Sequence, residues 1–439
     1  MKFNSATLFA ILAAGAYAAD ESSTSSGSAS ASSASSRSGS PTATSSNSRS
    51  TSNTCSFSSA TITNATALQQ VASCSTLDGD ITISGDEFAT IDLPQLEEIA
   101  GDVTITNARS LNSVILNQLT SIEGKLAITN MTQLITIDLS QLENSRDLEL
   151  VSLPSFANLM LNQEIEDVGR FTLSDTALSN LNVLTTFTTL QYMNINNNKN
   201  ITQLQFPNLK SVSDALILSF NNDDAVVELN ELQWASNLTI QSVRAFSAND
   251  LQNVNGTLQF SYNVFNALNL SNLSYVGSSL QVFAHDELAS LDFSNLREIG
   301  GELSFFNNSD LHDMSNTFPR LQTVEGAVAI SGDISNLTMS SLSRVVGDFQ
   351  LNSTSEDFDC SEFDQLHDDG DIEGHNYICS TSGSDSTLSS ATGSETGSSS
   401  TNSGFSGDGD ASNRSNASNK LIISSLLMPI GLILAIAML

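Results

Sequence analysis

The 439-residue chain is strongly acidic, since 48 Asp and Glu residues outnumber 15 Lys and Arg and give a formal net charge of −33 at pH 7. Nucleic acids and anionic membrane surfaces carry the same sign of charge and are therefore poor partners for it. Apolar side chains account for 39% of the sequence, which is enough to build a sizeable core.

Residues 1–18 are predicted to be a secretory signal peptide. An apolar run extends from Ala6 to Ala16, and Ala16-Tyr17-Ala18 forms an A-x-A cleavage site. The alternative, a membrane anchor, needs a longer run to cross a hydrocarbon layer about 30 Å thick. Residues 19–54 are nearly all Ser, Thr, Ala, Gly and Asn, which favours a solvated arm carrying O-glycans over a plain flexible linker.

From residue 77 to residue 351 the chain repeats one short phrase, for example GDITIS, GDVTIT, GKLAIT and GELSFF. Each phrase alternates apolar and polar residues, which is the period of a strand with one buried face. Thirteen copies recur 20–25 residues apart, and a fixed period in this range indicates a solenoid. We therefore expect an all-β fold, a right-handed parallel β-solenoid of about 13 coils of 22–23 residues. The first apolar residue of each copy, predicted to be buried, is Ile81, Val103, Leu126, Leu148, Phe171, Met193, Leu216, Leu238, Leu258, Leu280, Leu303, Val328 and Phe349.

Small and polar residues are expected to shape the corners of the coils. Eight copies carry Gly two residues before the strand, where a bend with positive φ is expected, at positions 79, 101, 124, 169, 256, 301, 326 and 347. Trp234, just before a strand, is predicted to be a core residue. Polar residues that follow several strands are expected to stack as a hydrogen-bonded ladder: Asn107, Asn130, Asp175, Asn197 and Asn307.

Four cysteines flank the repeats, with Cys55 and Cys74 before the first coil and Cys360 and Cys379 after the last. Three pairings are possible. Thirteen coils stacked at about 4.8 Å separate the two ends by about 60 Å, whereas a disulfide needs Cα atoms within about 7 Å. The expected bonds are therefore Cys55–Cys74 and Cys360–Cys379, each closing a cap on a solenoid domain of residues 55–379. A zinc site is disfavoured, because no C-x-x-C pair occurs and secreted cysteines are usually oxidised.

The C-terminal part is predicted to be a stalk followed by a signal for glycosylphosphatidylinositol (GPI) attachment. Residues 380–410 are rich in Ser, Thr and Gly, and a polar spacer precedes 19 uncharged residues at the end of the sequence. Asp410 is the expected attachment residue, with Gly409 and Asn413 as alternatives, and residues 411–439 would be removed. The other interpretation is a terminal transmembrane helix, which normally has polar flanks on both sides.

Twelve N-x-S/T sequons occur, and this density in a secreted chain predicts several N-glycans. Two of them, Asn413 and Asn416, lie near the C-terminus. The ten within or beside the repeats are Asn64, Asn130, Asn200, Asn237, Asn255, Asn269, Asn272, Asn307, Asn336 and Asn352.

Catalytic residues were sought on the outward face of the strands. Enzymes that cleave polysaccharides on such a scaffold pair two carboxyl groups, but Glu149 is the one acidic residue at the central outward positions of the thirteen copies. Asp223 and Asp224 are interpreted as a solvated turn. The acidic segment 364–375 lacks the spacing of a calcium loop. We therefore predict no catalytic residue, no metal site and no cofactor.

Aromatic residues mark a candidate ligand face. Phe283 and Phe306 occupy the same outward position on successive coils, and Tyr262 lies close by. Aromatic rings beside amide and hydroxyl groups are suited to hold a sugar ring or a protein partner. The alternative is that Phe283 and Phe306 lie under a long inter-coil loop.

The phrases FTLSDTALSNL, MNINNNKNI, LQWASNLTI and FSNLREIGGELSF, together with both signals and the cysteine pairs, resemble a known family. This chain looks like the fungal GPI-anchored cell-wall organisation proteins of the extracellular-mutant and sporulation-specific type, whose leucine-rich solenoid is similar to the receptor L domain. The similarity covers residues 55–379.

The resemblance implies a non-enzymatic glycoprotein at the plasma membrane and in the cell wall, needed for wall organisation and integrity. Implied partners are β-glucan, mannoproteins and, through the anchor, the plasma membrane, and a monomer is expected. The alternative is a surface receptor or adhesin that binds a glycan or protein on the solenoid face. A less favoured alternative is a wall-polysaccharide hydrolase or transglycosylase.

Overall fold

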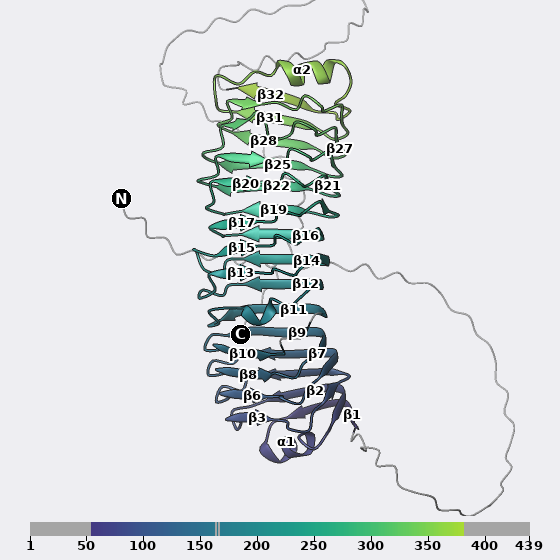
Figure 1. The fold of residues 1–439 in the computed structure, drawn as a ribbon, viewed down its shortest axis with the longest axis vertical. Coiled ribbons are helices and arrows are strands. Elements are labelled where there is room, and N and C mark those ends of the chain that lie inside the picture. The colour runs from purple at the N-terminus through teal and green to yellow at the C-terminus, as the bar shows by residue number, and fades with distance from the viewer. Residues whose placement is uncertain (1–53, 163–164, 166, 382–439) are drawn as a thin grey trace, which may run out of the picture. The chain divides into compact units, whose positions relative to one another are not determined.

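The computed structural model describes residues 54–162, 165 and 167–381, which form a parallel β-solenoid (Figure 1). One wall is a 21-stranded parallel sheet, here called the main sheet. Its strands are β1 (Thr54–Ile62), β2 (Thr76–Ser84), β4 (Glu98–Ile99), β5 (Asp102–Thr106), β7 (Ser121–Thr129), β9 (Asn144–Leu153), β11 (Asp167–Thr176), β12 (Thr189–Asn196), β14 (Ser211–Ser219), β16 (Trp234–Gln241), β18 (Asn253–Val254), β19 (Leu258–Ser261), β21 (Tyr275–Val276), β22 (Leu280–His285), β24 (Glu298–Ile299), β25 (Leu303–Asn308), β27 (Thr323–Val324), β28 (Val328–Gly332), β30 (Arg344–Val345), β31 (Phe349–Ser353) and β32 (Tyr377–Thr381).

The opposite wall consists of short parallel sheets. A four-stranded sheet contains β3 (Thr90–Asp92), β6 (Ser113–Ile115), β8 (Thr136–Leu139) and β10 (Asn158–Leu161), and a three-stranded sheet contains β13 (Gln203–Gln205), β15 (Val226–Glu228) and β17 (Ala245–Ser247). Two-stranded sheets pair β20 (Ala267–Asn269) with β23 (Ser290–Asp292), and β26 (Asp313–Met314) with β29 (Asn336–Leu337). The helical elements are α1 (Ala65–Val71), the 3-10 helix η1 (Asn182–Leu184) and α2 (Ser361–Asp368).

The predicted register of the repeats is confirmed. Each of the thirteen first apolar residues is the direct pairing partner of the next one along the stack, from Ile81 to Phe349. None of these side chains is more than 2% exposed. A slip of one residue would turn each strand's apolar side chains to solvent, so the alternating pattern fixes the register of every coil.

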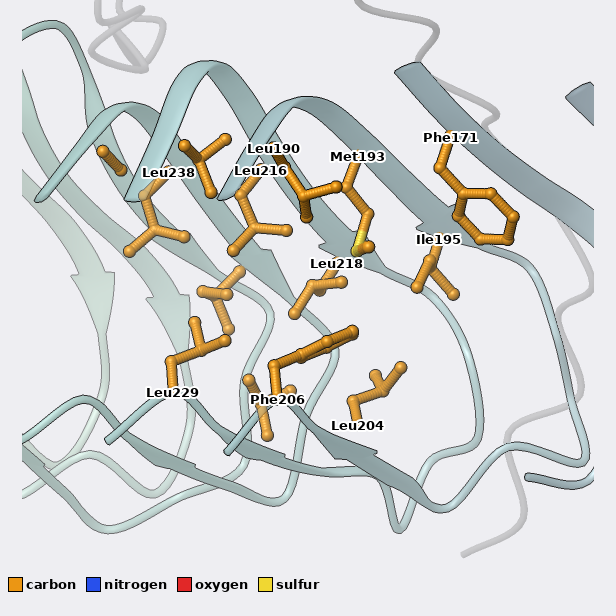
Figure 2. Packing of buried hydrophobic residues seen from close by; sticks show 14 of the residues in the cluster. Phe171, Leu190, Met193, Ile195, Leu204, Phe206, Leu216, Leu218, Leu229 and Leu238 are labelled. Atoms are coloured by element: carbon orange, nitrogen blue, oxygen red, sulfur yellow. The ribbon is translucent and has the colours of Figure 1, made fainter. Parts of the chain in front are cut away.

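The core fills the space between the two walls. Figure 2 shows side chains of the main sheet, such as Leu216 and Leu238, pointing toward Phe206 and Leu229 on the opposite wall. The prediction for Trp234 is wrong, because this residue is half-buried at the start of β16 and the inward position belongs to Ala235.

The glycines before the strands permit close approach of neighbouring coils. Of the eight, only Gly79 has a positive φ, 94°, so the expected bend is wrong at the other seven positions. A Cβ atom on Gly101 would lie 2.3 Å from the nitrogen of Gly79, and one on Gly124 would lie 2.1 Å from the carbonyl oxygen of Gly101. The backbones of successive coils therefore leave no room for a side chain at this corner.

The polar ladder exists, but it lies one residue later than predicted. Asn107, Asn130, Asp175, Asn197 and Asn307 adopt the left-handed conformation, with φ of 55–57°, and turn the chain at the strand end. The following side chain then points into the core, and the buried residues of the ladder are Asn198, Asn221, Asn263, His285 and Asn308. They bond along the stack, as in Asn198 Nδ2 donating to Asn221 Oδ1 at 3.1 Å.

Both ends of the solenoid are capped. β1 (Thr54–Ile62) extends the main sheet before β2, and β32 (Tyr377–Thr381) extends it after β31. Helices α1 and α2 lie at opposite ends of the stack (Figure 1). Disulfides join Cys55 to Cys74 and Cys360 to Cys379, with Cα–Cα distances of 5.8 and 6.0 Å. Within the described ranges, no helix is long and apolar enough to cross a membrane.

Candidate functional site

The outward face of the main sheet is charged near the N-terminal end. Asp102, Lys125, Asp147 and Arg170 occupy paired positions on β5, β7, β9 and β11, so that charges of opposite sign alternate along the stack. Lys125 also forms an ion pair with Glu149. Cross-strand pairs of opposite charge stabilise a sheet modestly, so this region has a structural explanation.

Partial burial and neighbouring charges shift the pKa values of two of these groups, Asp147 and Lys125. Desolvation raises the pKa of Asp147, although Lys125 and Arg170 act in the opposite direction. Desolvation lowers the pKa of Lys125, but its hydrogen bond to Glu149 and the nearby carboxylates outweigh that effect and raise the pKa overall. Lys125 therefore stays protonated and neutralises Glu149, the one acidic residue at the predicted central outward positions.

From β12 onward each longer strand of the main sheet has two inward apolar residues, and the outward residue that follows each of them is uncharged. We call this area the uncharged field, and it is notable in a chain with a net charge of −33. Its residues lie on the eight strands β12, β14, β16, β19, β22, β25, β28 and β31. They are Asn194, Asn196, Ile217, Ser219, Thr239, Gln241, Gln259, Ser261, Gln281, Phe283, Ser304, Phe306, Ala329, Ser331, Gln350 and Asn352.

Four aromatic rings form a continuous row along one edge of the uncharged field. We call Phe220, Tyr262, Phe283 and Phe306 the aromatic stripe. The ring centroids are 6.2 Å apart between Phe220 and Tyr262, 6.0 Å between Tyr262 and Phe283, and 4.8 Å between Phe283 and Phe306, which are stacked. Tyr262 is 49% exposed, and the other three rings are partly exposed.

Two rings of the stripe are held by a backbone conformation that aromatic residues rarely adopt. Phe220 and Tyr262 have φ values of 50° and 57° and occupy the left-handed position at the strand end. Such a conformation costs about 1–3 kcal/mol for a residue of this kind, although the same turn recurs at ten non-glycine positions among the described residues. Lys199 Nζ donates to the carbonyl oxygen of Phe220 at 3.1 Å and supports this turn.

Amide and hydroxyl groups adjoin the stripe. Gln241 Nε2 donates to Ser261 Oγ at 2.8 Å, and Gln259 Nε2 lies 3.4 Å from the same oxygen. Gln281 lies in register beside Gln259 on the next strand. The stripe is thus bordered by ordered groups that can both donate and accept hydrogen bonds.

The structure brings together the three predicted ligand-face residues, Tyr262, Phe283 and Phe306. Burial of Phe283 and Phe306 under a loop does not fit their remaining exposure. The role of these residues in binding stays a prediction. Sequence reasoning missed Phe220, although alignment of the copies would have shown an aromatic residue where other copies carry Asn197 or Asn307.

His285 lies behind the stripe and is not available to a ligand. Its side chain is fully buried, with Nε2 3.1 Å from Asn263 Nδ2 and Nδ1 3.0 Å from Asn308 Oδ1. Desolvation lowers the pKa of His285 to about 4, so the imidazole is neutral near pH 7. It accepts from Asn263, donates to Asn308 and serves as one step of the buried ladder.

Two shallow grooves lie elsewhere on the solenoid. One of about 650 Å³ runs along a corner of coils between β7 and β14, and the buried hydroxyl of Ser145 in its wall has no hydrogen-bond partner. The other, of about 660 Å³, is lined by Gln252, Asn272, Ser274, Tyr275, Asn295, Arg297 and Glu298. Neither contains a row of aromatic rings.

The acidic candidates are not assembled for catalysis or metal binding. Asp224 lies 3.6 Å from Arg244 in an exposed turn. In the segment 364–375, Asp364 accepts from the hydroxyl of Tyr377, and Glu373 pairs with Arg344 at 2.9 Å. Among the described residues, no group of three or more His, Cys, Asp or Glu side chains is placed to hold a metal ion.

The ten predicted sequons in the solenoid differ in accessibility. Nine of the asparagines are exposed, and Asn237 is the half-buried exception. Its Nδ2 donates to the carbonyl oxygen of Asp214 at 2.9 Å, and its Oδ1 accepts from the Thr257 N–H at 2.9 Å. The predicted GPI-attachment residues Gly409, Asp410 and Asn413, and the two C-terminal sequons Asn413 and Asn416, lie outside the described residues.

Comparisons with known proteins agree with this architecture. The Receptor L domain family model matches residues 73–166. The chain is 50% identical to the cell surface GPI-anchored protein ECM33 of Candida albicans, over 73% of this chain and 77% of that protein. It is 33% identical to the cell wall mannoprotein PST1 of Saccharomyces cerevisiae, over 71% and 69% of the two chains. Sporulation-specific protein 2 of the same yeast is 29% identical, over 69% and 60%. The chain therefore belongs to the fungal family of GPI-anchored cell-surface and cell-wall proteins that includes ECM33 and PST1.

Proposed function

We propose that this chain is a non-enzymatic scaffold that supports cell-wall organisation and integrity. The observation that carries the proposal is the outward face of the main sheet, where the central positions offer a single carboxylate, Glu149, paired with Lys125. Hydrolysis of a glycosidic bond needs two carboxyl groups on either side of it. A regular sheet with a compensated charged region and a large uncharged field is better suited to holding partners than to acid–base chemistry.

In this proposal the terminal segments deliver and tether the solenoid. The signal peptide 1–18 directs secretion, the arm 19–54 precedes the domain, and the stalk 380–410 spaces it from a GPI anchor on Asp410, with Gly409 and Asn413 as alternatives. Loss of residues 411–439 accompanies attachment. Except for residues 54, 380 and 381, these segments lie outside the described residues. The anchor is supported by two relatives that are named as cell surface GPI-anchored proteins.

The proposed partners are uncharged wall polysaccharide, in particular β-glucan, and mannoproteins, with the plasma membrane reached through the anchor. The strongly acidic composition disfavours nucleic acid. Exposed sequons distributed along the solenoid favour a monomer, since bulky glycans obstruct stacking of one copy on another.

Release experiments test the tethering. Phosphatidylinositol-specific phospholipase applied to intact cells, and β-glucanase applied to purified walls, should each release the protein. Retention through both treatments, with extraction only by detergent, would contradict the GPI anchor and support a transmembrane tail. Turnover of β-glucan oligomers by the folded protein would contradict the non-enzymatic scaffold and support a hydrolase or transglycosylase.

A second candidate function is a surface receptor or adhesin, and the aromatic stripe favours it. Exposed rings such as Tyr262 beside amide groups are typical of ligand sites. A binding array of glycans and proteins separates the two candidates. Saturable binding of a protein, or of a glycan that is not a wall polysaccharide, lost on combining Phe283→Ala with Phe306→Ala, would favour a receptor or adhesin.

A further inference from the structure

We infer that the aromatic stripe and the adjoining part of the uncharged field form an extended binding site for a neutral pyranose polysaccharide, whose chain runs along the solenoid axis. This inference deepens the proposed function, on which it rests, by assigning a site and a ligand class. Its elements are Phe220, Tyr262, Phe283 and Phe306 for stacking, and the neighbouring glutamines for hydrogen bonding.

The spacing of the rings suits a chain of sugars. Strands in a sheet lie about 4.8 Å apart, and the stripe crosses the sheet from the end of β14 to the end of β25 with successive centroids 4.8–6.2 Å apart. The apolar faces of pyranose rings stack on aromatic side chains. A ligand that lies across the strands therefore meets a ring on almost every coil.

The polar border supplies the matching hydrogen bonds. Gln241, Gln259 and Gln281 present amides on three successive strands next to the stripe. An amide both donates and accepts, which suits sugar hydroxyl groups that do the same. The buried hydroxyl of Ser261 accepts from Gln241 and holds that amide in place on β16.

Charge selects the class of polysaccharide. The field beside the stripe has no charged side chain, whereas Asp286, Glu287 and Asp310 are exposed near the turns that follow it. Anionic polysaccharides would meet these carboxylates and the net charge of −33. A cationic ligand would find stronger partners in the acidic regions outside the field. The neutral surface is thus complementary to a neutral chain.

The backbone gives an independent indication. The position of Phe220 and Tyr262 is occupied in five other coils by Asn or Asp, which tolerate a positive φ, and in three by Ser152, Ser242 and Ala284. Two aromatic residues at this position weaken the fold locally, yet both place their rings in one row. Stability of the fold does not explain aromatic residues at this position, whereas a ligand that stacks on the rings does.

Equilibrium binding of a linear β-1,3-glucan oligosaccharide to the full chain, purified in detergent, tests this inference. The wild-type chain should bind saturably. Phe220→Asn and Tyr262→Asn should each weaken binding about tenfold, with thermal stability unchanged or raised because asparagine accepts the left-handed backbone. The matched control is Tyr275→Ala, which removes a half-exposed ring outside the stripe and should leave affinity unchanged.

Four results would overturn the inference. The first is absence of saturable binding by the wild-type chain, and the second is equal binding by the stripe variants. The third is binding that appears only in Asn307→Gln, because the N-glycan next to Phe306 would then be the occupant of the stripe. Preferential binding of an anionic polysaccharide would also contradict it. If the chain restores wall integrity without binding the oligosaccharide, this inference alone is contradicted. If neither phospholipase nor glucanase releases the protein, the proposed tether alone is contradicted.

Discussion

Removal of one rung of the buried ladder should destabilise the solenoid strongly. Asn221 is 1% exposed, and its Oδ1 accepts from the backbone N–H and from Nδ2 of Asn198, both at 3.1 Å. Its Nδ2 donates to the carbonyl oxygen of Ile195 at 2.9 Å. Asn221→Ala removes these three hydrogen bonds, each worth about 1 kcal/mol net, and leaves a small cavity. The expected loss is about 3–4 kcal/mol of the free energy of unfolding.

Chemical denaturation monitored by circular dichroism measures this loss, with the midpoint and slope fitted together. Asn222→Ala is the matched control, because Asn222 is the next residue but is only half-buried, although it bonds to the backbone of Lys199 and of Asp224. The control should lose about 1 kcal/mol or less. Equal losses in the two variants, or a loss below about 1 kcal/mol for Asn221→Ala, would refute the structural importance of the ladder.

Three further predictions concern the corner, the ladder and a cap. Gly124→Ala places a Cβ atom 2.1 Å from the carbonyl oxygen of Gly101, so secretion measured by immunoblot should fall sharply, and wild-type levels would argue against the stacked corner. Because burial lowers the pKa of His285 to about 4, the unfolded chain takes up the proton first, and about 3 kcal/mol of stability should be lost between pH 6.5 and pH 4. Denaturation across that range should show this slope in the wild type and a flatter one in His285→Asn; identical slopes would exclude His285 as the cause. Cys360→Ser should cost about 2–5 kcal/mol, measured as lower resistance of the C-terminal cap to proteolysis, and unchanged resistance would show that the disulfide adds little.

The repeating strands could be predicted because their pattern is local. Apolar and polar residues alternate within each copy, and one face of every strand must be buried, so the positions from Ile81 to Phe349 follow directly. The cysteine pairs followed from the length of the stack. These features depend on the period of the chain alone, and the predicted apolar residues of successive copies pair directly in the structure.

The corners were harder to predict, because they depend on contacts between coils. The local sequence around Gly101 predicts a positive φ, yet the nearby backbone of Gly79 is the reason for glycine there. Likewise, Asn197 is polar and follows a strand, but its left-handed backbone gives the inward position to Asn198. Phe220 joined the candidate site only once the turns of different coils were stacked.

The most direct test of the scaffold function is a complementation experiment in fungal cells that lack this chain. Resistance to a wall-binding dye is measured after return of the wild-type chain or of a chain that ends at Asp410 and is secreted without an anchor. A scaffold must be held in place, whereas a secreted enzyme can act while diffusing. We predict that the wild-type chain restores resistance and that the unanchored chain does not. Full restoration by the unanchored chain would contradict the proposed scaffold.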